Sequence, residues 1–192
     1  MQPPPISEQF DIAAATDACV RAPAVVPVTL RTIGAADAGI EQEFIARLSP
    51  RSRRYRFFSG LKELTPAMLA RFINVDYPAE MALIATVPVA GREQEIGVAR
   101  YAQWSRPGTV EFAVVVADEW QRKGVARRLL ERLFAVARAD GWQEIEGLVL
   151  RENTGMLKLM DKLGFTRHRY EGDPAVVHVR LALDAVAPSG SR

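Results

Sequence analysis

Apolar positions recur with two different spacings along this chain, and the mixture predicts a domain that contains both strands and helices. Short apolar runs typical of strands occur at residues 28–33, 81–86, 96–102, 110–116, 145–150, 165–170 and 176–183. Apolar residues three or four positions apart, typical of amphipathic helices, occur at residues 34–48, 49–58, 65–73, 125–140 and 156–163. Three strands in succession before one long helix favour an α/β (α+β) fold with a single mixed, mostly antiparallel sheet of about six to seven strands, flanked by helices.

The two ends of the chain lack this patterning. Residues 1–27 carry five prolines and an alanine-rich stretch, and repeated proline disfavours regular hydrogen-bond ladders. We therefore expect a flexible N-terminal tail over residues 1–27, with a short helix around residues 7–20 as the open alternative. The folded domain is expected at residues 28–183, and residues 184–192, which are small and polar, are expected to be frayed.

Composition narrows the classes of function. The chain has 192 residues and a formal net charge of +2, which suits one domain and gives no argument for nucleic-acid binding. Its single cysteine, Cys19, excludes an internal disulfide, and two histidines leave little for a metal centre, so we expect no metal. No run approaches the ~18 apolar residues of a membrane span, and no secretory signal opens the chain. We expect a cytoplasmic protein without a membrane partner.

The most informative stretch is residues 110–126, where an apolar run leads through a short loop into the long helix. The loop reads Gln121-Arg122-Lys123-Gly124-Val125-Ala126. Small residues at 124 and 126 let backbone amides approach an anion closely, and the start of a helix adds positive potential. This pattern indicates a phosphate-bearing ligand. The alternative is an ordinary strand-to-helix turn with a solvated basic cap, because short glycine motifs recur widely.

Two landmarks at this separation resemble the Gcn5-related N-acetyltransferases (GNAT). The first is the loop at residues 121–126, which resembles that family's acetyl-CoA loop. The second is Asn153 followed by the run MLKLMDKLGF at residues 156–165, which resembles the family's helix ending in Leu-Gly-Phe. The resemblance covers residues 28–183. Within the family, the segments GVARY and EFAVVV are most similar to bacterial protein-lysine acetyltransferases.

The resemblance implies a cofactor, acetyl-CoA, and a set of residues that bind it in a sheet splayed at the cofactor site. The strand backbone would pair with the pantetheine arm, and the amide of Val114 would bind the thioester oxygen. The loop amides would bind the pyrophosphate, and Asn153 would lie beside the pantetheine. The implied cofactor-binding residues are Val114, Val115, Val116, Gln121, Arg122, Lys123, Gly124, Val125, Ala126, Arg127 and Asn153.

Glu111 is the candidate general base. A lysine amine has a reference pKa of about 10.4 and must lose a proton before it attacks a thioester. A carboxylate beside Phe112 on the ligand strand can be desolvated, which raises its pKa. The alternative is a strand-edge glutamate paired with an arginine. The resemblance also places Met160 where many members of the family have a tyrosine general acid. Three routes then stay open for the leaving thiolate: it leaves unprotonated, it takes a proton from water, or it uses another residue. Tyr101 and Tyr170 are conceivable donors, but a structural role in a strand is the stronger interpretation of each.

These observations predict an N-acetyltransferase that moves acetyl from acetyl-CoA to an amine by direct transfer. By resemblance, the expected acceptor is a protein lysine, for example on an acyl-CoA synthetase. The arginines at 51, 53, 54 and 56 could receive an acidic protein surface, although a solvated helix face explains them equally well. Two rival functions stay open: a small-molecule amine acetyltransferase of the same fold, and a non-catalytic CoA-binding module.

Overall fold

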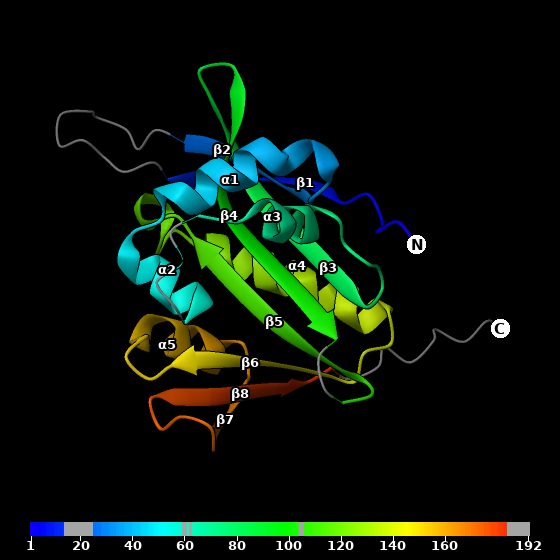
Figure 1. Cartoon of the computed structure of the whole chain (residues 1–192), viewed down its shortest axis with the longest axis vertical. Helices are drawn as coiled ribbons and strands as arrows, with labels where there is room; N and C mark the ends of the chain where they lie inside the picture. The colour runs from blue at the N-terminus through cyan, green and yellow to red at the C-terminus, as the bar shows by residue number, and fades with distance from the viewer. Residues whose placement is uncertain (14–24, 59–60, 62, 104–105, 184–192) are drawn as a thin grey trace.

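The computed structural model describes residues 1–13, 25–58, 61, 63–103 and 106–183, and these residues build one continuous eight-stranded sheet with helices on both faces (Figure 1). The strand order is β1-β2-β3-β4-β5-β6-β8-β7. The strands are β1 (Ser7–Ala13), β2 (Val25–Thr32), β3 (Glu80–Val89), β4 (Arg92–Gln103), β5 (Thr109–Val116), β6 (Glu144–Leu150), β7 (Thr166–Arg169) and β8 (Val176–Ala182). The α-helices are α1 (Ala38–Arg47), α2 (Pro50–Phe57), α3 (Pro66–Ile73), α4 (Val125–Ala139) and α5 (Thr154–Lys162). The mixed, mostly antiparallel sheet predicted from the sequence is confirmed.

Helix α4 follows β5 and covers one face of the central strands. Its apolar side is fully buried in the main core, and it packs against β3, β4 and β5. Glycines in the left-handed region bound the helix at both ends, with φ of 88° at Gly124 and 82° at Gly141. The opposite face carries a second apolar cluster built from α1, α3 and the other side of the strands. The strand-loop-helix unit thus forms the centre of the fold, as the sequence pattern predicted.

The expectation of a flexible tail over residues 1–27, or of a helix at residues 7–20, is wrong for residues 25–27, which begin β2, and for residues 7–13. Residues 7–13 form β1, which pairs antiparallel with β2 from Ser7 opposite Arg31 to Ala13 opposite Val25. Ile6 and Ile12 are buried in the main core. The free edge of β2 and these apolar side chains outweigh the neighbouring prolines, because the proline run ends before the strand begins. This edge strand also explains why the sheet has eight strands. Residues 14–24 and the expected C-terminal tail at 184–192 lie outside the described residues.

Strands β5 and β6 run parallel and separate soon after they meet. Their pairing covers only Thr109–Glu111 with Glu144–Glu146, whereas β4 pairs with β5 along residues 97–103 and 110–116. On the other side, β6 pairs with β8 along its whole length. The sheet therefore opens into a V whose apex lies at Glu111 and Glu146.

Candidate active site

The backbone of β5 beyond Glu111 is available to a ligand on the side facing β6. In the part of the chain that the structure describes, residues 112–116 have no strand partner on that side. A strand edge with free donors and acceptors accepts an extended, amide-containing chain as an additional strand. Pantetheine is such a chain. The structure thus brings Val114, Val115 and Val116 to the edge of the opening between β5 and β6.

The loop after β5 presents backbone amides at the start of α4. A short 3-10 turn, Asp118–Trp120, precedes it, and two loop residues take positive φ values, 63° at Arg122 and 88° at Gly124. The first amides of α4, at Val125, Ala126 and Arg127, precede the repeating helical hydrogen bonds, so they are free to bind an anion. Such a cradle fits a pyrophosphate.

The basic side chains of the loop are not equally free. The ammonium of Lys123 lies 5.1 Å from the centre of the Trp120 ring, and the guanidinium of Arg127 pairs with Glu131 at 2.7 Å. Arg122 is exposed. Since Arg127 already has an acidic partner, its backbone amide is better placed than its side chain to hold a phosphate.

Helix α2 is fixed over the end of β5 by two side chains of the loop. Asp118 accepts hydrogen bonds from the amide of Ser49 at 3.0 Å and from the hydroxyls of Ser49 and Ser52 at 2.8 and 2.9 Å. Gln121 donates to the hydroxyl of Ser52 and to the carbonyl of Val116, both at 3.0 Å. Asp118 therefore binds the start of α2, not the start of α4, and Gln121 serves as a brace at the loop entrance.

Asn153 lies between β6 and α5, beyond the wide end of the opening. Its side-chain oxygen accepts a hydrogen bond from the amide of Met156 at 3.2 Å and caps α5. Asn153 thus follows the end of β6 that has separated from β5. No hydrogen bond joins its side-chain nitrogen to another of the described residues, so the two donors of that nitrogen can bind a ligand.

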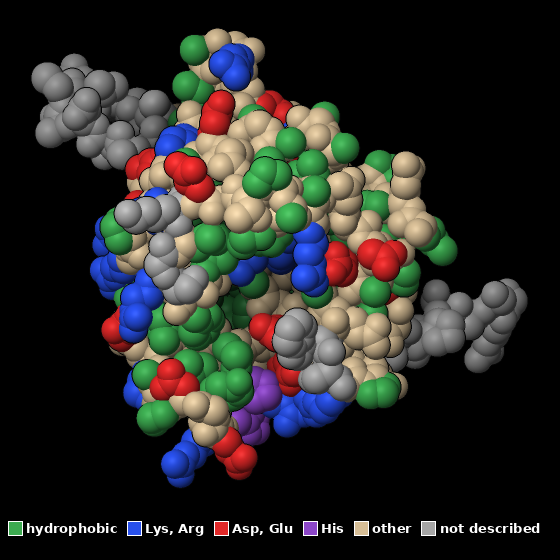
Figure 2. Space-filling model, in the orientation of Figure 1, with side chains coloured by type: hydrophobic (Ala, Val, Ile, Leu, Met, Phe, Trp, Pro, Cys, Tyr) green, Lys and Arg blue, Asp and Glu red, His purple; other side chains and the backbone are tan. Residues whose placement is uncertain are grey.

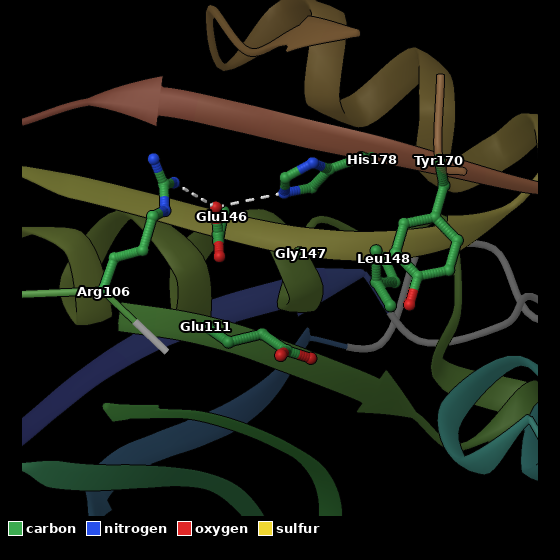
Figure 3. A pocket seen from close by; sticks show the side chains of 7 residues that line it. All are labelled: Arg106, Glu111, Glu146, Gly147, Leu148, Tyr170 and His178. Atoms are coloured by element: carbon green, nitrogen blue, oxygen red, sulfur yellow. Dashed lines mark hydrogen bonds and ion pairs between the residues drawn. The ribbon is translucent and has the colours of Figure 1, made fainter. Parts of the chain in front are cut away.

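Glu111 lies at the apex of the opening and lines a pocket of about 320 Å³ (Figure 3). Figure 2 shows this face of the molecule hollowed near its centre, with acidic, basic and histidine side chains around the hollow. Glu111 is half-buried. Burial raises its pKa above the ordinary value, the nearby Glu146 raises it further, and Arg56 opposes both effects. A carboxylate of raised basicity, open to a pocket, has the properties of a general base.

Several pocket residues were not found by sequence reasoning. Besides Glu111 and Tyr170, which the sequence singled out, the side chains that line it are Arg106, Glu146, Leu148 and His178. These four come from the β4–β5 loop, β6 and β8, so no local motif joins them. Glu146 precedes Gly147, where a Cβ would lie 2.6 Å from the Phe112 ring. Glycine there allows β6 to approach β5 closely at the apex.

The three residues considered for protonating the thiolate are now distinguished by position. Met160 is fully buried in the main core, and Tyr101 is buried with its hydroxyl donating to Asp140 at 2.7 Å. Only Tyr170 reaches the pocket. Met160 and Tyr101 thus have structural roles.

Within residues 1–13, 25–58, 61, 63–103 and 106–183, no three histidine, cysteine or acidic residues are grouped so as to hold a metal ion. Among the helices described, none is long and apolar enough to cross a membrane.

Known proteins are similar to this chain in sequence and in fold. A family model for the acetyltransferase (GNAT) domain matches residues 28–166. Acetyltransferase PA5475 of Pseudomonas aeruginosa is 36% identical over 156 residues, covering 81% of this chain and 84% of that protein. Acetyltransferase Pat of Mycolicibacterium smegmatis is 32% identical over 111 residues, covering 57% of this chain and 33% of Pat.

A solved structure adds the three-dimensional likeness. The GNAT domain of S. lividans PAT matches with a TM-score of 0.75 at 27% identity, covering 92% of this chain and 97% of that one. The open β5 edge and the amide cradle at α4 fit the acetyl-CoA that GNAT acetyltransferases use. The chain therefore belongs to the GNAT family and is an acetyl-CoA-dependent N-acetyltransferase.

Proposed function

We propose that this enzyme transfers acetyl from acetyl-CoA to a lysine side chain of another protein, with Glu111 as general base. The observation that carries the proposal is the position of Glu111: half-buried, of raised pKa, at the apex of the opening and in the wall of a pocket. A carboxylate whose pKa is raised is a stronger base than an ordinary one and is better able to take a proton from an amine.

The proposed cofactor site follows the elements around Glu111. Residues 114–116 hold the pantetheine arm as an added strand, and the amide of Val114 donates to the thioester oxygen. The loop at residues 121–127 holds the pyrophosphate by its backbone amides. Asn153 binds the pantetheine with the free donors of its side chain.

The proposed reaction proceeds by direct transfer. Glu111 accepts the proton of the acceptor's ammonium group, and the free amine attacks the thioester carbonyl. The carbonyl oxygen gains negative charge and is stabilised by the β5 amide. The C–S bond then breaks, the nitrogen releases its second proton to water as the amide product forms, and the CoA thiolate takes a proton from water. Because a thiol has a reference pKa of about 8.5, this last step costs little at neutral pH.

A protein acceptor is supported by the likeness to Pat and to the S. lividans PAT domain. It is also supported by helix α2, which carries Arg51, Arg53 and Arg54 on its partly or fully exposed side and packs against β5. Basic side chains there would guide an acidic protein surface towards the pocket. An acyl-CoA synthetase in the cytoplasm is the acceptor that we would test first.

The test is a thiol-release assay with acetyl-CoA and two sets of acceptors: folded proteins, including an acyl-CoA synthetase, and small amines. Modified lysines are then located by peptide mass spectrometry. We expect release that depends on the protein acceptor and acetyl groups at defined lysines. Transfer to small amines with none to any folded protein would overturn the proposal.

The second candidate is acetylation of a small free amine. The pocket favours it in one respect, since about 320 Å³ is enough for a compact cationic amine and is lined by two carboxylates. The same assay separates the two functions by the ratio of kcat/KM values for protein and small-amine acceptors.

A further inference from the structure

A second carboxylate stands beside the proposed base. Glu111 and Glu146 are register partners, the last pair of residues that β5 and β6 share before they separate. Register partners on parallel strands project from the same face of the sheet. Both side chains line the pocket in Figure 3, and Glu146 is only 8% exposed. Nothing in the proposed reaction yet uses this buried acid.

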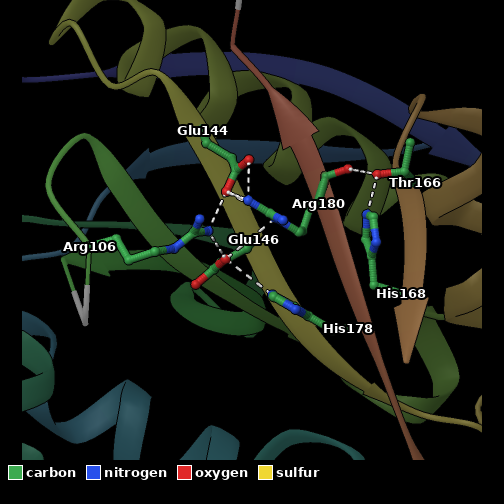
Figure 4. Close-up of polar contacts among 7 residues, drawn as sticks. All are labelled: Arg106, Glu144, Glu146, Thr166, His168, His178 and Arg180. Atoms are coloured by element: carbon green, nitrogen blue, oxygen red, sulfur yellow. Dashed lines mark hydrogen bonds and ion pairs between the residues drawn. The ribbon is translucent and has the colours of Figure 1, made fainter. Parts of the chain in front are cut away.

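Two other elements hold the carboxylate of Glu146 in place (Figure 4). Arg106, from the β4–β5 loop, donates to its Oε2 at 2.6 Å, and His178 of β8 has its Nε2 3.1 Å from the same oxygen. Arg180, also on β8, lies 3.9 Å away. An acid anchored by partners from separate elements has one orientation, which is the property required of a group that positions others.

The anchoring leaves part of the carboxylate for the pocket. Among the described residues, every hydrogen bond to the side-chain carboxylate of Glu146 ends on Oε2. Figure 3 shows the other oxygen turned away from Arg106 and His178, towards the strand that carries Glu111. A negative charge in that position attracts a cationic amine and disfavours a second negative charge on Glu111.

We propose that Glu146 is a positioning residue of the acceptor site: Arg106 and His178 fix its carboxylate beside Glu111, where it draws in the charged amine and strengthens Glu111 as a base. The inference rests on Glu111 being the general base of the proposed function. The charged and titratable groups that face Glu111 are Glu146 of β6, Arg56 of α2, Arg106 of the β4–β5 loop, Tyr170 of the β7–β8 loop and His178 of β8.

The test compares Glu146→Gln with a matched control on the same strand. Glu144→Gln removes an equivalent charge two residues away, and Glu144 shares Arg106 and Arg180 with Glu146 but does not line the pocket. The first measurement is an NMR titration of the Glu111 carboxyl in each variant, which needs no acceptor. We expect Glu111 to titrate at lower pH in Glu146→Gln than in the wild type, and at the wild-type pH in Glu144→Gln.

The second measurement is kinetic, with the acceptor identified in the thiol-release assay. Glu146→Gln should raise KM for the amine about fivefold, the size expected for losing one partly buried charge, while acetyl-CoA binds as before. Glu146→Asp, which keeps the charge, should recover much of the loss. If Glu146→Gln fails to bind acetyl-CoA because it does not fold, Glu146→Asp and His178→Asn decide the question by the same titration.

Two results would overturn the inference: Glu111 titrating identically in the wild type and Glu146→Gln, or Glu144→Gln reproducing the full effect. Both are independent of the acceptor. Absence of transfer to protein lysines by the wild type would count against the proposed function alone, because the titration of Glu111 would still report on Glu146.

Discussion

Glu111 and Glu146 meet at the wall of a pocket, whereas Glu41 of α1 and Glu95 of β4 meet inside the protein, where both are 0% exposed. The pocket pair is partly compensated, because Arg106 and His178 bind Glu146. The core pair has no such partners: within the described residues, none of its four oxygens has a hydrogen bond. Two pairs of glutamate side chains therefore lie in opposite surroundings, one pair at a pocket and one in the core.

The comparison teaches that a raised pKa does not by itself mark a catalytic carboxylate. Burial is the main cause of the raised pKa of Glu111 and of Glu95, and in each a second glutamate adds to it. The two differ in access: Glu111 is open to solvent and to a substrate, whereas Glu95 is not. They also differ in their neighbours, because the charge of Glu146 beside Glu111 is balanced by bound cationic partners. We infer that the core pair belongs to the packing of the interior and that the pocket pair takes part in the reaction.

The largest expected effect is that of Glu111→Gln. Turnover should fall by about 10²–10⁴-fold, the usual contribution of a general base, while the Kd for acetyl-CoA stays near the wild-type value. Because burial raises the pKa of Glu111, the wild-type kcat/KM should fall as pH drops through that raised value. Thiol release and calorimetric titration measure the two quantities.

The control for this substitution is Glu95→Gln, which changes the same chemical group in the core. It should keep wild-type turnover. Equal loss of activity in both variants would break the comparison, since accessibility would then not distinguish the two pairs.

The second effect is on stability and belongs to the core pair. A glutamate titrates near pH 4.3 in an unfolded chain, and burial beside Glu41 raises the pKa of Glu95 well above that value in the folded protein. Between these two pH values the folded protein holds a proton that the unfolded chain has released, so the free energy of unfolding falls as pH rises. Glu95→Gln removes this dependence.

At pH 8 we expect Glu95→Gln to raise the free energy of unfolding by about 1–2 kcal/mol, the scale of an unpartnered buried polar group. At pH 4 the two proteins should be nearly equal. Urea denaturation at both pH values measures the difference. Loss of stability at pH 8 would mean that Glu95 is ionised and pairs with the neighbouring Arg100.

The sequence could indicate where the cofactor half of the site is expected, because all of its proposed residues except Asn153 lie in one continuous stretch. The strand, the loop at residues 121–127 and the helix form one local pattern, and Glu111 stands at the start of that strand. The proposed acceptor site could not be predicted from the sequence, because Arg106, Glu146 and His178 come together only through the pairing of strands. The sequence order β6, β7, β8 gives no sign that β8 lies between the other two.

The wrong prediction for residues 7–13 also has its cause in the pairing of strands. Strand β1 exists because the edge of β2 offers it partners, and that edge is a property of the assembled sheet. The alternating Phe10 and Ile12 were a usable signal, but the prolines at 3–5 and the alanine-rich stretch dominated the local pattern.

The third effect is on the binding of acetyl-CoA, which the reaction at the pocket pair needs and the core pair does not. Gly124→Ala places a side chain at a φ of 88°, where nothing lies within 4 Å, so the cost is backbone strain and not a clash. That strain is about 1 kcal/mol. Relieving it shifts the amides at the start of α4, and the Kd for acetyl-CoA should rise about fivefold.

Gly141→Ala is the matched control, because Gly141 has a φ of 82° and open space at the other end of α4. Both variants should lose similar stability in thermal unfolding, but only Gly124→Ala should bind acetyl-CoA more weakly. Equal weakening would show that stability, and not the amide cradle, governs binding.

The smallest effect comes from Arg56, the cation that acts on both pairs. Its charge lowers the pKa of Glu111 and also acts on Glu41. Its guanidinium lies 4.8 Å from the centre of the Phe57 ring, so Arg56→Met keeps an apolar contact while removing the charge. Glu111 should then titrate at higher pH, and kcat/KM at pH 7 should fall about twofold and recover at higher pH.

Arg51→Met is the control on the same helix, since Arg51 is exposed, and its pH profile should match that of the wild type. Arg56→Met and Glu146→Gln must shift the acidic limb of the profile in opposite directions, because one removes a positive and the other a negative neighbour of Glu111. A shift in the same direction would mean that these substitutions act through packing, and the electrostatic account of the pocket pair would fail.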